Sequence, residues 1–439
     1  MKARLPLIAA MAVALAPLDA SAQAWLGSPD FSEGAGIRAG NLELHPSIGA
    51  EFGYDSNFTR ASAAEGPVDV MKLRVTPSLT LSSLGRARRN TDTPPNVAFA
   101  ASAYASYFEL FPLDSEDSEV RKRRNVSAGV DTKVDVFPHR KVGFDLMAGW
   151  RRVIEVEGRS EDLAGEGFNR GTFRYGAGVT WRPGGGLFEW RGGYTGTFNY
   201  FENDSFDSLQ NLHHDVNTRG RWRFLPRSAV LFDTSYTFIR YTNANTSQTD
   251  GDILRSRIGF HGLVTYHLAL LGMVGWASTF YKAHAGSIVP RQYDSIIANA
   301  EVRWFIQPRP NLETATIATG LSSMALGYTR SVNNSYLGSF YSRDRGYLQF
   351  SAFLLGAIAG GLEFGVSRVS FPAAVGGNVN TPAIDQLRLD GRVFGEYRFT
   401  ETIAANATFL YDHVMSDAVP NDDLDYRRWQ AYLGLRWFM

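Results

Sequence analysis

Cysteine, long apolar segments and net charge are all missing from this sequence. Without cysteine among its 439 residues, the chain forms no disulfide, and lipidation of a mature N-terminal cysteine is excluded. Its 44 lysines and arginines balance 44 acidic residues, and no basic tract suggests a nucleic acid partner. After the first 22 residues no apolar run reaches about 18 residues, so no transmembrane helix is predicted. The fold must therefore be stabilised by its own backbone ladder or core.

The N-terminal segment is predicted to be a secretory signal peptide. Lys2 and Arg4 precede an apolar run from Leu5 to Leu15, and Ala20-Ser21-Ala22 provides a cleavage site. Residues 1–22 are therefore placed outside the fold. Residues 23–41 are predicted to form a short periplasmic lead into the first strand.

Side-chain alternation at the C-terminus is the clearest positive signal. Apolar or aromatic residues occupy every second position, at Trp429, Ala431, Leu433, Leu435, Trp437 and Met439, and mostly polar or small residues lie between them. A strand points alternate side chains to opposite faces, so this segment has one apolar and one polar face. It resembles the C-terminal assembly signal that the insertion machinery of outer-membrane β-barrels reads. Trp429, Leu433, Leu435, Trp437, Phe438 and Met439 would form that signal, with Met439 where Phe is usual.

The same two-residue rhythm continues through residues 42–439, while helical periodicity is almost absent. Aromatic residues make up 13% of the chain and glycine is frequent, as a membrane barrel requires. The predicted strands are 42–54, 72–81, 97–111, 126–136, 142–153, 173–182, 188–200, 213–224, 229–241, 253–267, 268–282, 292–306, 322–332, 340–354, 361–369, 384–399, 403–413 and 429–439. The predicted fold is an all-β, transmembrane, antiparallel up-and-down β-barrel of about 18 strands, closed between the first and last strand.

The connections between these strands alternate in length. Short links at 137–140, 183–186, 225–228 and 400–402 follow even-numbered strands, and longer polar links follow odd-numbered ones. This is the pattern of periplasmic turns and extracellular loops. Two even links, 83–96 and 307–321, are longer and are predicted to be periplasmic contact sites. Loops 154–171 and 370–383 are candidates for folding inward to narrow the lumen.

Strand parity predicts a polar, arginine-rich lumen. The lumen arginines are Arg74, Arg151, Arg174, Arg191, Arg219, Arg221, Arg223, Arg255, Arg257, Arg303, Arg343, Arg345, Arg388, Arg392, Arg398, Arg428 and Arg436, interleaved with acids such as Glu51, Asp131, Asp145, Glu189 and Asp233. Two interpretations remain open. The arginines form cross-strand ion pairs that stiffen the wall, or some of them, above all Arg219, Arg221 and Arg223, form a functional basic track. The predicted register sets Lys133 opposite Asp145 and Arg221 opposite Asp233.

Three arginines, Arg240, Arg330 and Arg368, break the apolar outward face near its predicted extracellular end. They are predicted to contact lipopolysaccharide phosphates; ordinary snorkelling of long cationic side chains is the alternative.

No enzyme, cofactor or metal site is predicted. There is no G-x-S-x-G elbow and no serine paired with a histidine. His213-His214-Asp215 could bind a metal only poorly, because adjacent strand residues point in opposite directions.

The start of the predicted barrel resembles a known family. Gly36-Ile37-Arg38-Ala39-Gly40, the strand through Pro46, and Tyr54-Asp55-Ser56-Asn57 are similar to the opening of β-barrel porins encoded with exopolysaccharide gene clusters, the Wzp-like barrels. The resemblance covers about 25 residues and implies export of a polysaccharide across the outer membrane with a periplasmic Wza-like export protein. Lumen aromatic residues Tyr104, Phe394 and Tyr432 would then stack on sugars, or simply pack.

The residues themselves leave the cargo open. A polysaccharide conduit, lined by Arg219, Arg221, Arg223, Arg255, Arg257, Arg388, Arg392, Arg398 and Tyr432, is the first hypothesis. A general or anion-preferring diffusion porin is the second. An adhesin or structural barrel ranks last, because it would need longer loops than this sequence has.

Overall fold

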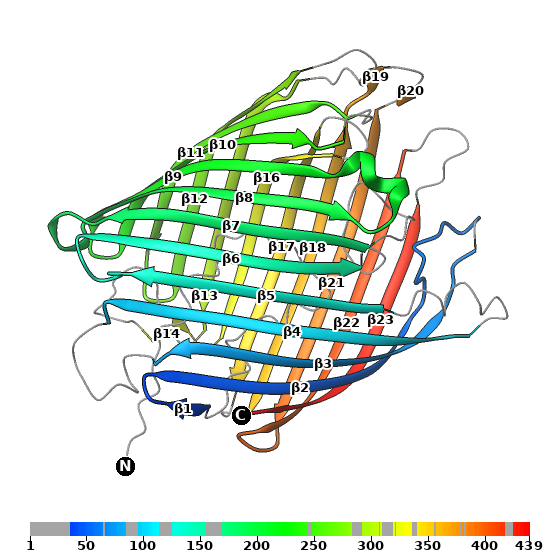
Figure 1. Ribbon diagram of the computed structural model, residues 1–439, viewed down its shortest axis with the longest axis horizontal. Coiled ribbons are helices and arrows are strands. Elements are labelled where there is room, and N and C mark those ends of the chain that lie inside the picture. The colour runs from blue at the N-terminus through cyan, green and yellow to red at the C-terminus, as the bar shows by residue number, and fades with distance from the viewer. Residues whose placement is uncertain are drawn as a thin grey trace.

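A closed antiparallel β-barrel accounts for almost all of the residues that the structure describes (Figure 1). The computed structural model describes residues 36–64, 66–84, 95–113, 125–154, 169–243, 248–282, 292–306, 308–309, 319–320, 322–335, 340–354, 357–376, 379–381, 383–417 and 425–439. The predicted signal peptide and most of the predicted periplasmic lead lie outside these residues.

Eighteen long strands in the described residues form the wall, each paired with its neighbours in sequence order. They are β2 (Leu42–Asp55), β3 (Val70–Ser83), β4 (Val97–Pro112), β5 (Asn125–Val136), β6 (Val142–Ile154), β7 (Asn169–Trp181), β8 (Phe188–Phe201), β9 (Asn211–Leu225), β10 (Ser228–Tyr241), β11 (Asp250–Leu263), β12 (Leu268–Lys282), β13 (Asp294–Phe305), β16 (Ser323–Asn334), β17 (Phe340–Leu354), β18 (Ile358–Phe371), β21 (Ile384–Arg398), β22 (Ile403–Ser416) and β23 (Tyr426–Phe438). The predicted strand number and the predicted closure are both confirmed.

The first and last strands close the barrel. β2 and β23 pair from Ser47 with Phe438 to Asp55 with Gln430. The lower edge of β2, below the end of β23, is covered by β1 (Ile37–Ala39), which pairs antiparallel with residues 42–44. Closure leaves no long unpaired edge at this seam, as a lipid environment requires.

The outward face of the wall is continuously apolar. Leu433, Leu326 and Ile258 are 71%, 62% and 60% exposed, and large apolar side chains occupy the same parity on every barrel strand. A water-soluble monomer does not expose apolar surface on this scale. The architecture is that of an outer-membrane β-barrel, with lipid against the outer face and the polar residues inside.

Helical structure in the described residues is limited to two short 3-10 turns, η4 (Gly184–Gly186) and η5 (Asp204–Leu209). None of the helices in this part of the chain has the length and hydrophobicity needed to cross a membrane.

β1 and the C-terminus lie at the end of the barrel that carries the short turns, which is therefore the periplasmic end (Figure 1). Two small hairpins lie outside the wall: β14 (Pro308–Arg309) with β15 (Thr319–Gly320), and β19 (Ala374–Gly376) with β20 (Val379–Thr381). Most of the predicted contact links 83–96 and 307–321 falls outside the described residues, as does most of loop 154–171.

The predicted cross-strand register was wrong at two turns. Asp145 lies opposite Asp135, not Lys133, and Asp233 lies opposite Arg219, not Arg221. The first turn is displaced by Phe137, whose φ of 51° places it in the left-handed region. In the second, the register shifts between Ser228 and Ala229. Such local irregularities do not change the alternation of apolar and polar side chains along the strands. The sequence pattern therefore does not reveal them.

A proline interrupts the backbone pairing between β3 and β4. Pairing with β4 is interrupted between Val75 and Ser78, where Pro77 lacks an amide donor. Thr76 and Ser106 bridge this interval with a hydroxyl–hydroxyl hydrogen bond of 2.7 Å. The ladder resumes on both sides in the same register.

Candidate functional site

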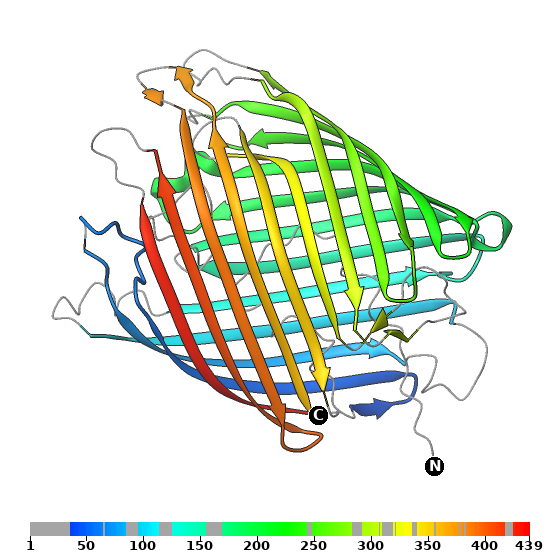
Figure 2. The ribbon, with the colours of Figure 1, turned by 180° about the vertical axis from the view of Figure 1, so that it is seen from behind.

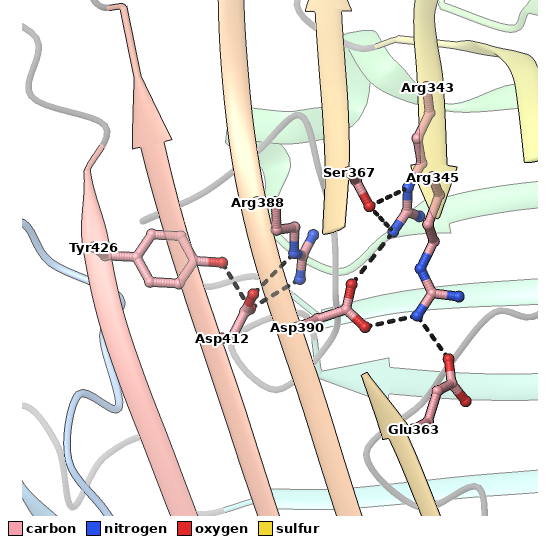
Figure 3. A network of polar contacts seen from close by, with 8 residues as sticks. All are labelled: Arg343, Arg345, Glu363, Ser367, Arg388, Asp390, Asp412 and Tyr426. Atoms are coloured by element: carbon pink, nitrogen blue, oxygen red, sulfur yellow. Dashed lines mark hydrogen bonds and ion pairs between the residues drawn. The ribbon is translucent and has the colours of Figure 1, made fainter. Parts of the chain in front are cut away.

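The lumen beside β17 to β23 contains a polar network that crosses five strands (Figure 3). Arg345 bridges Glu363 and Asp390 at 2.6 and 2.7 Å. Arg343 donates to Ser367 at 3.0 Å and lies 3.8 Å from Asp390. Since these side chains come from β17, β18 and β21, their contacts fix the curvature of the wall as well as its charge.

The network continues across β21, β22 and β23. Arg388 forms a two-pronged contact with Asp412, 2.8 Å to each carboxylate oxygen, and the Tyr426 hydroxyl donates to the same carboxylate at 2.9 Å. Fork-shaped arginine–carboxylate contacts of this kind are strong and directional. Arg388 is therefore buried, and its guanidinium is paired with Asp412.

Ion pairs at the seam are still more deeply buried. Arg428 contacts Asp55 through Nε at 2.8 Å, and their side chains are 3% and 0% exposed. Arg74 contacts Glu51 through Nε at 2.8 Å. Removing one member of such a pair leaves an uncompensated buried charge, so these residues hold the seam closed.

A loop folds inward over the seam. Residues 56–64 and 66–68, here called the inward loop, connect β2 to β3, and Phe58 packs with Val70, Phe108 and Leu110 on the lumen face of β3 and β4. The guanidinium of Arg60 lies 5.9 Å from the centre of the Tyr426 ring. Burial lowers the pKa of Arg60, and its position joins the inward loop to the network on β22 and β23. The sequence did not predict that this loop folds inward.

The Tyr54-Asp55-Ser56-Asn57 motif anchors this loop. The Tyr54 hydroxyl donates to Asp69 at 2.6 Å, and Asp55 holds Arg428. The Asn57 amide exchanges hydrogen bonds with both backbone groups of Ala61, at 2.7 and 3.0 Å. The motif thus has a structural role in this chain: it turns the chain from the wall into the lumen.

A second inward element is formed by the adjoining ends of β16 and β17. The Val332 carbonyl accepts from Arg255 at 2.9 Å, and Asn334 donates to the Tyr241 hydroxyl at 3.1 Å. Their partners are on β11 and β10. Behind this element lies an apolar group, here called the rim cluster, made of Ile239, Ile253, Ala277, Tyr293, Ile297, Val332 and Phe340.

The opposite wall, β5 to β11, carries exposed lumen charges. Arg257 donates hydrogen bonds to both carboxylate oxygens of Asp233, at 3.0 and 2.9 Å. Arg191 donates to both carboxylate oxygens of Asp145 in the same way. Arg219 lies between these pairs, opposite both Arg191 and Asp233. Because the neighbouring acids are already engaged, exposed Arg219 has no ion pair within the described residues.

The other members of the predicted basic track differ from one another. Arg221 shares Glu189 with Arg182, at 3.4 and 2.8 Å. Arg223 makes no ion pair in the described part of the chain, and its buried Nε has no hydrogen-bond partner there. The row on β9 therefore carries more positive than negative charge.

The remaining predicted lumen residues lie on the predicted face, with different exposure. Arg392 lies 6.0 Å from the Phe394 ring, and Arg398 contacts Glu396 at 3.0 Å. Tyr432 is only 4% exposed beneath Arg74. A β-carbon at Gly53 would overlap its ring, so glycine there permits the close approach of β2 and β23. Tyr432 has little surface to offer a passing solute.

Arg240, Arg330 and Arg368 all lie on the outward face, each beside an aspartate. The distances are 2.7 Å to Asp252, 3.5 Å to Asp344 and 3.0 Å to Asp385. Hydroxyl groups of Tyr236 and Tyr328 donate to the first two aspartates. These groups form a mixed-charge, aromatic border where a polar membrane interface is expected.

The residues of the predicted assembly signal divide between the two faces. Trp429, Leu433, Leu435 and Trp437 are exposed outward, whereas Phe438 is buried inside against Arg436, 4.9 Å from its ring centre. The backbone of Met439 donates to the Pro46 carbonyl at 3.1 Å and so completes the seam.

The histidines form no common site. His213 faces the lumen, whereas His214 faces outward and contacts the Tyr194 hydroxyl at 2.6 Å. His267 was predicted on a strand with His261, but β11 ends at Leu263 and His267 lies in the following turn. No group of three or more potential ligands in the described residues could hold a metal.

Sequence reasoning missed the loop residues Phe58 and Arg60, and it placed Lys72 on the polar face of a strand without giving it a role. Lys72 is buried with its Nζ 4.4 Å from the centre of the Phe108 ring. The available signal was the unusual combination of aromatic and cationic residues in a polar loop, Asn57-Phe58-Thr59-Arg60. Alternation cannot reveal it, because a loop has no strand period.

No protein-family model matches the chain. No curated protein matches it either. Among solved structures, the outer membrane protein OpdK of Pseudomonas aeruginosa aligns with a TM-score of 0.46 at 10% identity, covering 90% of this chain and 98% of that chain. OccAB4 of Acinetobacter baumannii aligns with a TM-score of 0.47 at 9% identity, covering 91% and 98%. At these values the likeness bears on neither solute nor mechanism.

Proposed function

We propose that this protein is an outer-membrane channel for small anionic solutes, with the β9 arginine row as its selectivity track. The observation that carries this proposal is the arrangement around Arg219. Asp233 and Asp145, the acids nearest to it, are held by Arg257 and Arg191, so its positive charge remains available to a solute.

Geometry supports a track rather than a single site. Arg219, Arg221 and Arg223 point to the same face at two-residue spacing, about 7 Å apart along the strand. Repeated weak sites of one sign let an ion enter without being trapped, because it can pass from one cation to the next.

The test is ion selectivity in planar bilayers. Arg219→Gln is expected to lower the anion-to-cation permeability ratio, measured from the reversal potential in a salt gradient. Arg240→Gln removes the same charge from the outward face and serves as the matched control. An unchanged ratio in the Arg219 variant, or an equal fall in both, would contradict the proposal.

Export of an exopolysaccharide is the second candidate, favoured by the resemblance of residues 36–57 to the Wzp-like barrels. It would require a periplasmic Wza-like partner, and a long polymer would have to pass both inward elements. Deletion of the gene separates the candidates. Loss of surface polysaccharide with normal uptake of small anions would support export, and the reverse result would support the anion channel.

We further propose that the outward border meets the phosphates of lipopolysaccharide through Arg240, Arg330 and Arg368. Each arginine has an aspartate neighbour, so the phosphate must compete with a carboxylate. Replacing all three with glutamine should reduce the lipopolysaccharide that co-purifies with the barrel, and unchanged recovery would refute this contact.

A further inference from the structure

Four short turns at the periplasmic end contain cations and no acids. They connect β5 to β6, β7 to β8, β9 to β10 and β11 to β12, over residues 137–141, 182–187, 226–227 and 264–267. Their lysine and arginine residues are Arg140, Lys141, Arg182 and Arg227, and none of the four turns contains aspartate or glutamate. This part of the periplasmic end is therefore positively charged.

Hydrogen bonds join these turns into one continuous stretch of the barrel end. The Arg182 amide donates to the Lys141 carbonyl, and the Leu263 amide donates to the Arg227 carbonyl, at 2.7 and 2.9 Å. The ladder between β8 and β9 connects the two halves. Figure 2 shows the cyan and green turns of this side at the right of the view, and the orange turn between β21 and β22 at the bottom, apart from them.

Acids at the adjoining strand ends are already paired. Asp135, near the end of β5, contacts Lys133 at 3.0 Å. Glu189, near the start of β8, contacts Arg182 at 2.8 Å. These two carboxylates belong to the polar inner face, so they leave the other cations of the turns without a counter-charge.

Arg140, Lys141 and Arg227, here called the turn cations, make no ion pair in the described part of the chain, and Arg140 and Lys141 are exposed. In this they differ from the three outward arginines at the extracellular end, each of which has an aspartate neighbour. The turn cations therefore remain available to an anion outside the protein.

Aromatic rings hold the two arginines in place. The Arg140 guanidinium lies 4.2 Å from the centre of the Phe137 ring, and that of Arg227 lies 4.2 Å from the centre of the Tyr266 ring. Arg140 also donates to the Asn96 side chain at 3.2 Å. Stacking uses the face of a guanidinium and leaves N–H groups at its edge, which suit the oxygens of a phosphate.

The outward face beside these turns is aromatic and exposed. Trp222 and Phe224 on β9 are 56% and 43% exposed, and the Phe224 ring lies 6.2 Å from that of Phe260 on β11. Exposed aromatic rings at a barrel end mark the depth of the lipid headgroups. Long cationic side chains in the adjoining turns reach a phosphate at that depth.

The short turns on the other side of the barrel have a different charge. The turns between β17 and β18 and between β21 and β22, residues 355–357 and 399–402, contain no lysine or arginine, and the second contains Glu401. Aromatic residues are exposed there as well, since Tyr397 is 49% exposed. The two sides therefore differ in charge and not in the presence of an apolar outer face.

We propose that the periplasmic end of β5 to β12 binds anionic phospholipids of the inner leaflet. The turn cations contact the lipid phosphates, and the acyl chains lie on the outward face of the same strands. A negatively charged headgroup is favoured over a zwitterionic one, whose own amine would be repelled by the turn cations. This inference is independent of the anion track, which lies on the inner face of β9.

Contact quenching by spin-labelled lipids tests the preference at two matched positions. Phe224 and Tyr397 are each the penultimate residue of their strand, and both are exposed. Because the chain has no cysteine, Phe224→Cys and Tyr397→Cys can each carry a single fluorophore. In phosphatidylcholine liposomes, nitroxide-labelled phosphatidylglycerol should quench the probe at 224 at least about fivefold more effectively than nitroxide-labelled phosphatidylcholine, the effect of one interfacial cation. The probe at 397 should show no such preference.

Removing the turn cations tests their role. Combining Arg140→Gln, Lys141→Gln and Arg227→Gln should abolish the phosphatidylglycerol preference at position 224 and leave quenching by phosphatidylcholine unchanged. Arg38→Gln, which removes a cation from β1 at the same end of the barrel, is the control and should preserve the preference. Equal quenching by the two lipids at 224, an equal preference at 397, or a preference that survives the triple substitution would each overturn the proposal. The first comparison needs no charge substitution, so it decides even if the triple variant fails to fold.

Discussion

The two sides of the lumen use the same arginine–carboxylate chemistry at opposite levels of burial. At the seam, the Arg428 and Asp55 side chains are 3% and 0% exposed, and on the far wall those of Arg151 and Asp131 are 51% and 47% exposed. A buried pair becomes costly when one partner is lost, whereas an exposed pair contributes little. Cross-strand ion pairs therefore close the barrel on one side and remain accessible to solutes on the other.

The largest effect is expected at the seam. Asp55→Ala should destabilise the barrel by about 3–5 kcal/mol, because it leaves Arg428 buried without its carboxylate. Urea unfolding in detergent, followed by tryptophan fluorescence, measures the loss. Adding Arg428→Met to this variant should recover much of it. A cost below about 1 kcal/mol for Asp55→Ala would erase the distinction between the two sides.

The inward loop is expected to give the next largest effect. Phe58→Ala removes a buried aromatic side chain and should cost the loop about 3–5 kcal/mol of local stability, while the wall remains folded. Limited proteolysis should then cleave residues 56–68, and channel conductance should rise. Resistance to protease with unchanged conductance would mean that the loop is held by other contacts.

The far wall supplies the matched comparison for the seam. Asp131→Ala should change the free energy of unfolding by no more than about 1 kcal/mol, because both partners are half exposed to lumen water. The same urea titration applies. A loss similar to that of Asp55→Ala would indicate that the two walls are equally dependent on their ion pairs.

The smallest effect is expected at the extracellular rim. Hydrogen bonding from Arg152 lowers the pKa of Glu202, so this contact stabilises the fold above the unfolded-state pKa of the carboxyl group and is lost as pH falls through the folded one. Glu202→Gln should therefore cost under about 1 kcal/mol at pH 7 and less at pH 3. Equal differences at both pH values would assign the effect to packing.

Many of the long strands could be located closely because lipid on one side and polar residues on the other impose a strict two-residue period. The strands 268–282 and 340–354 were predicted with their observed bounds. Register was less predictable: the local shift at Ser228 and the left-handed Phe137 moved whole ladders without altering the hydrophobic pattern. Arg388 and Tyr432 are both buried, and their burial depends on residues from other strands.

Alternation of apolar and polar side chains by itself determined that this chain forms a closed membrane barrel, because any other arrangement would leave a backbone edge or an apolar face in the wrong solvent. Only the tertiary structure decided which lumen arginines form ion pairs with carboxylates and which, like Arg219, form none in the described residues and can contact a solute. Only the tertiary structure revealed where the inward loop and the bent end of β16 enter the lumen. These outcomes depend on contacts between distant strands and loops, for which the local sequence has no period.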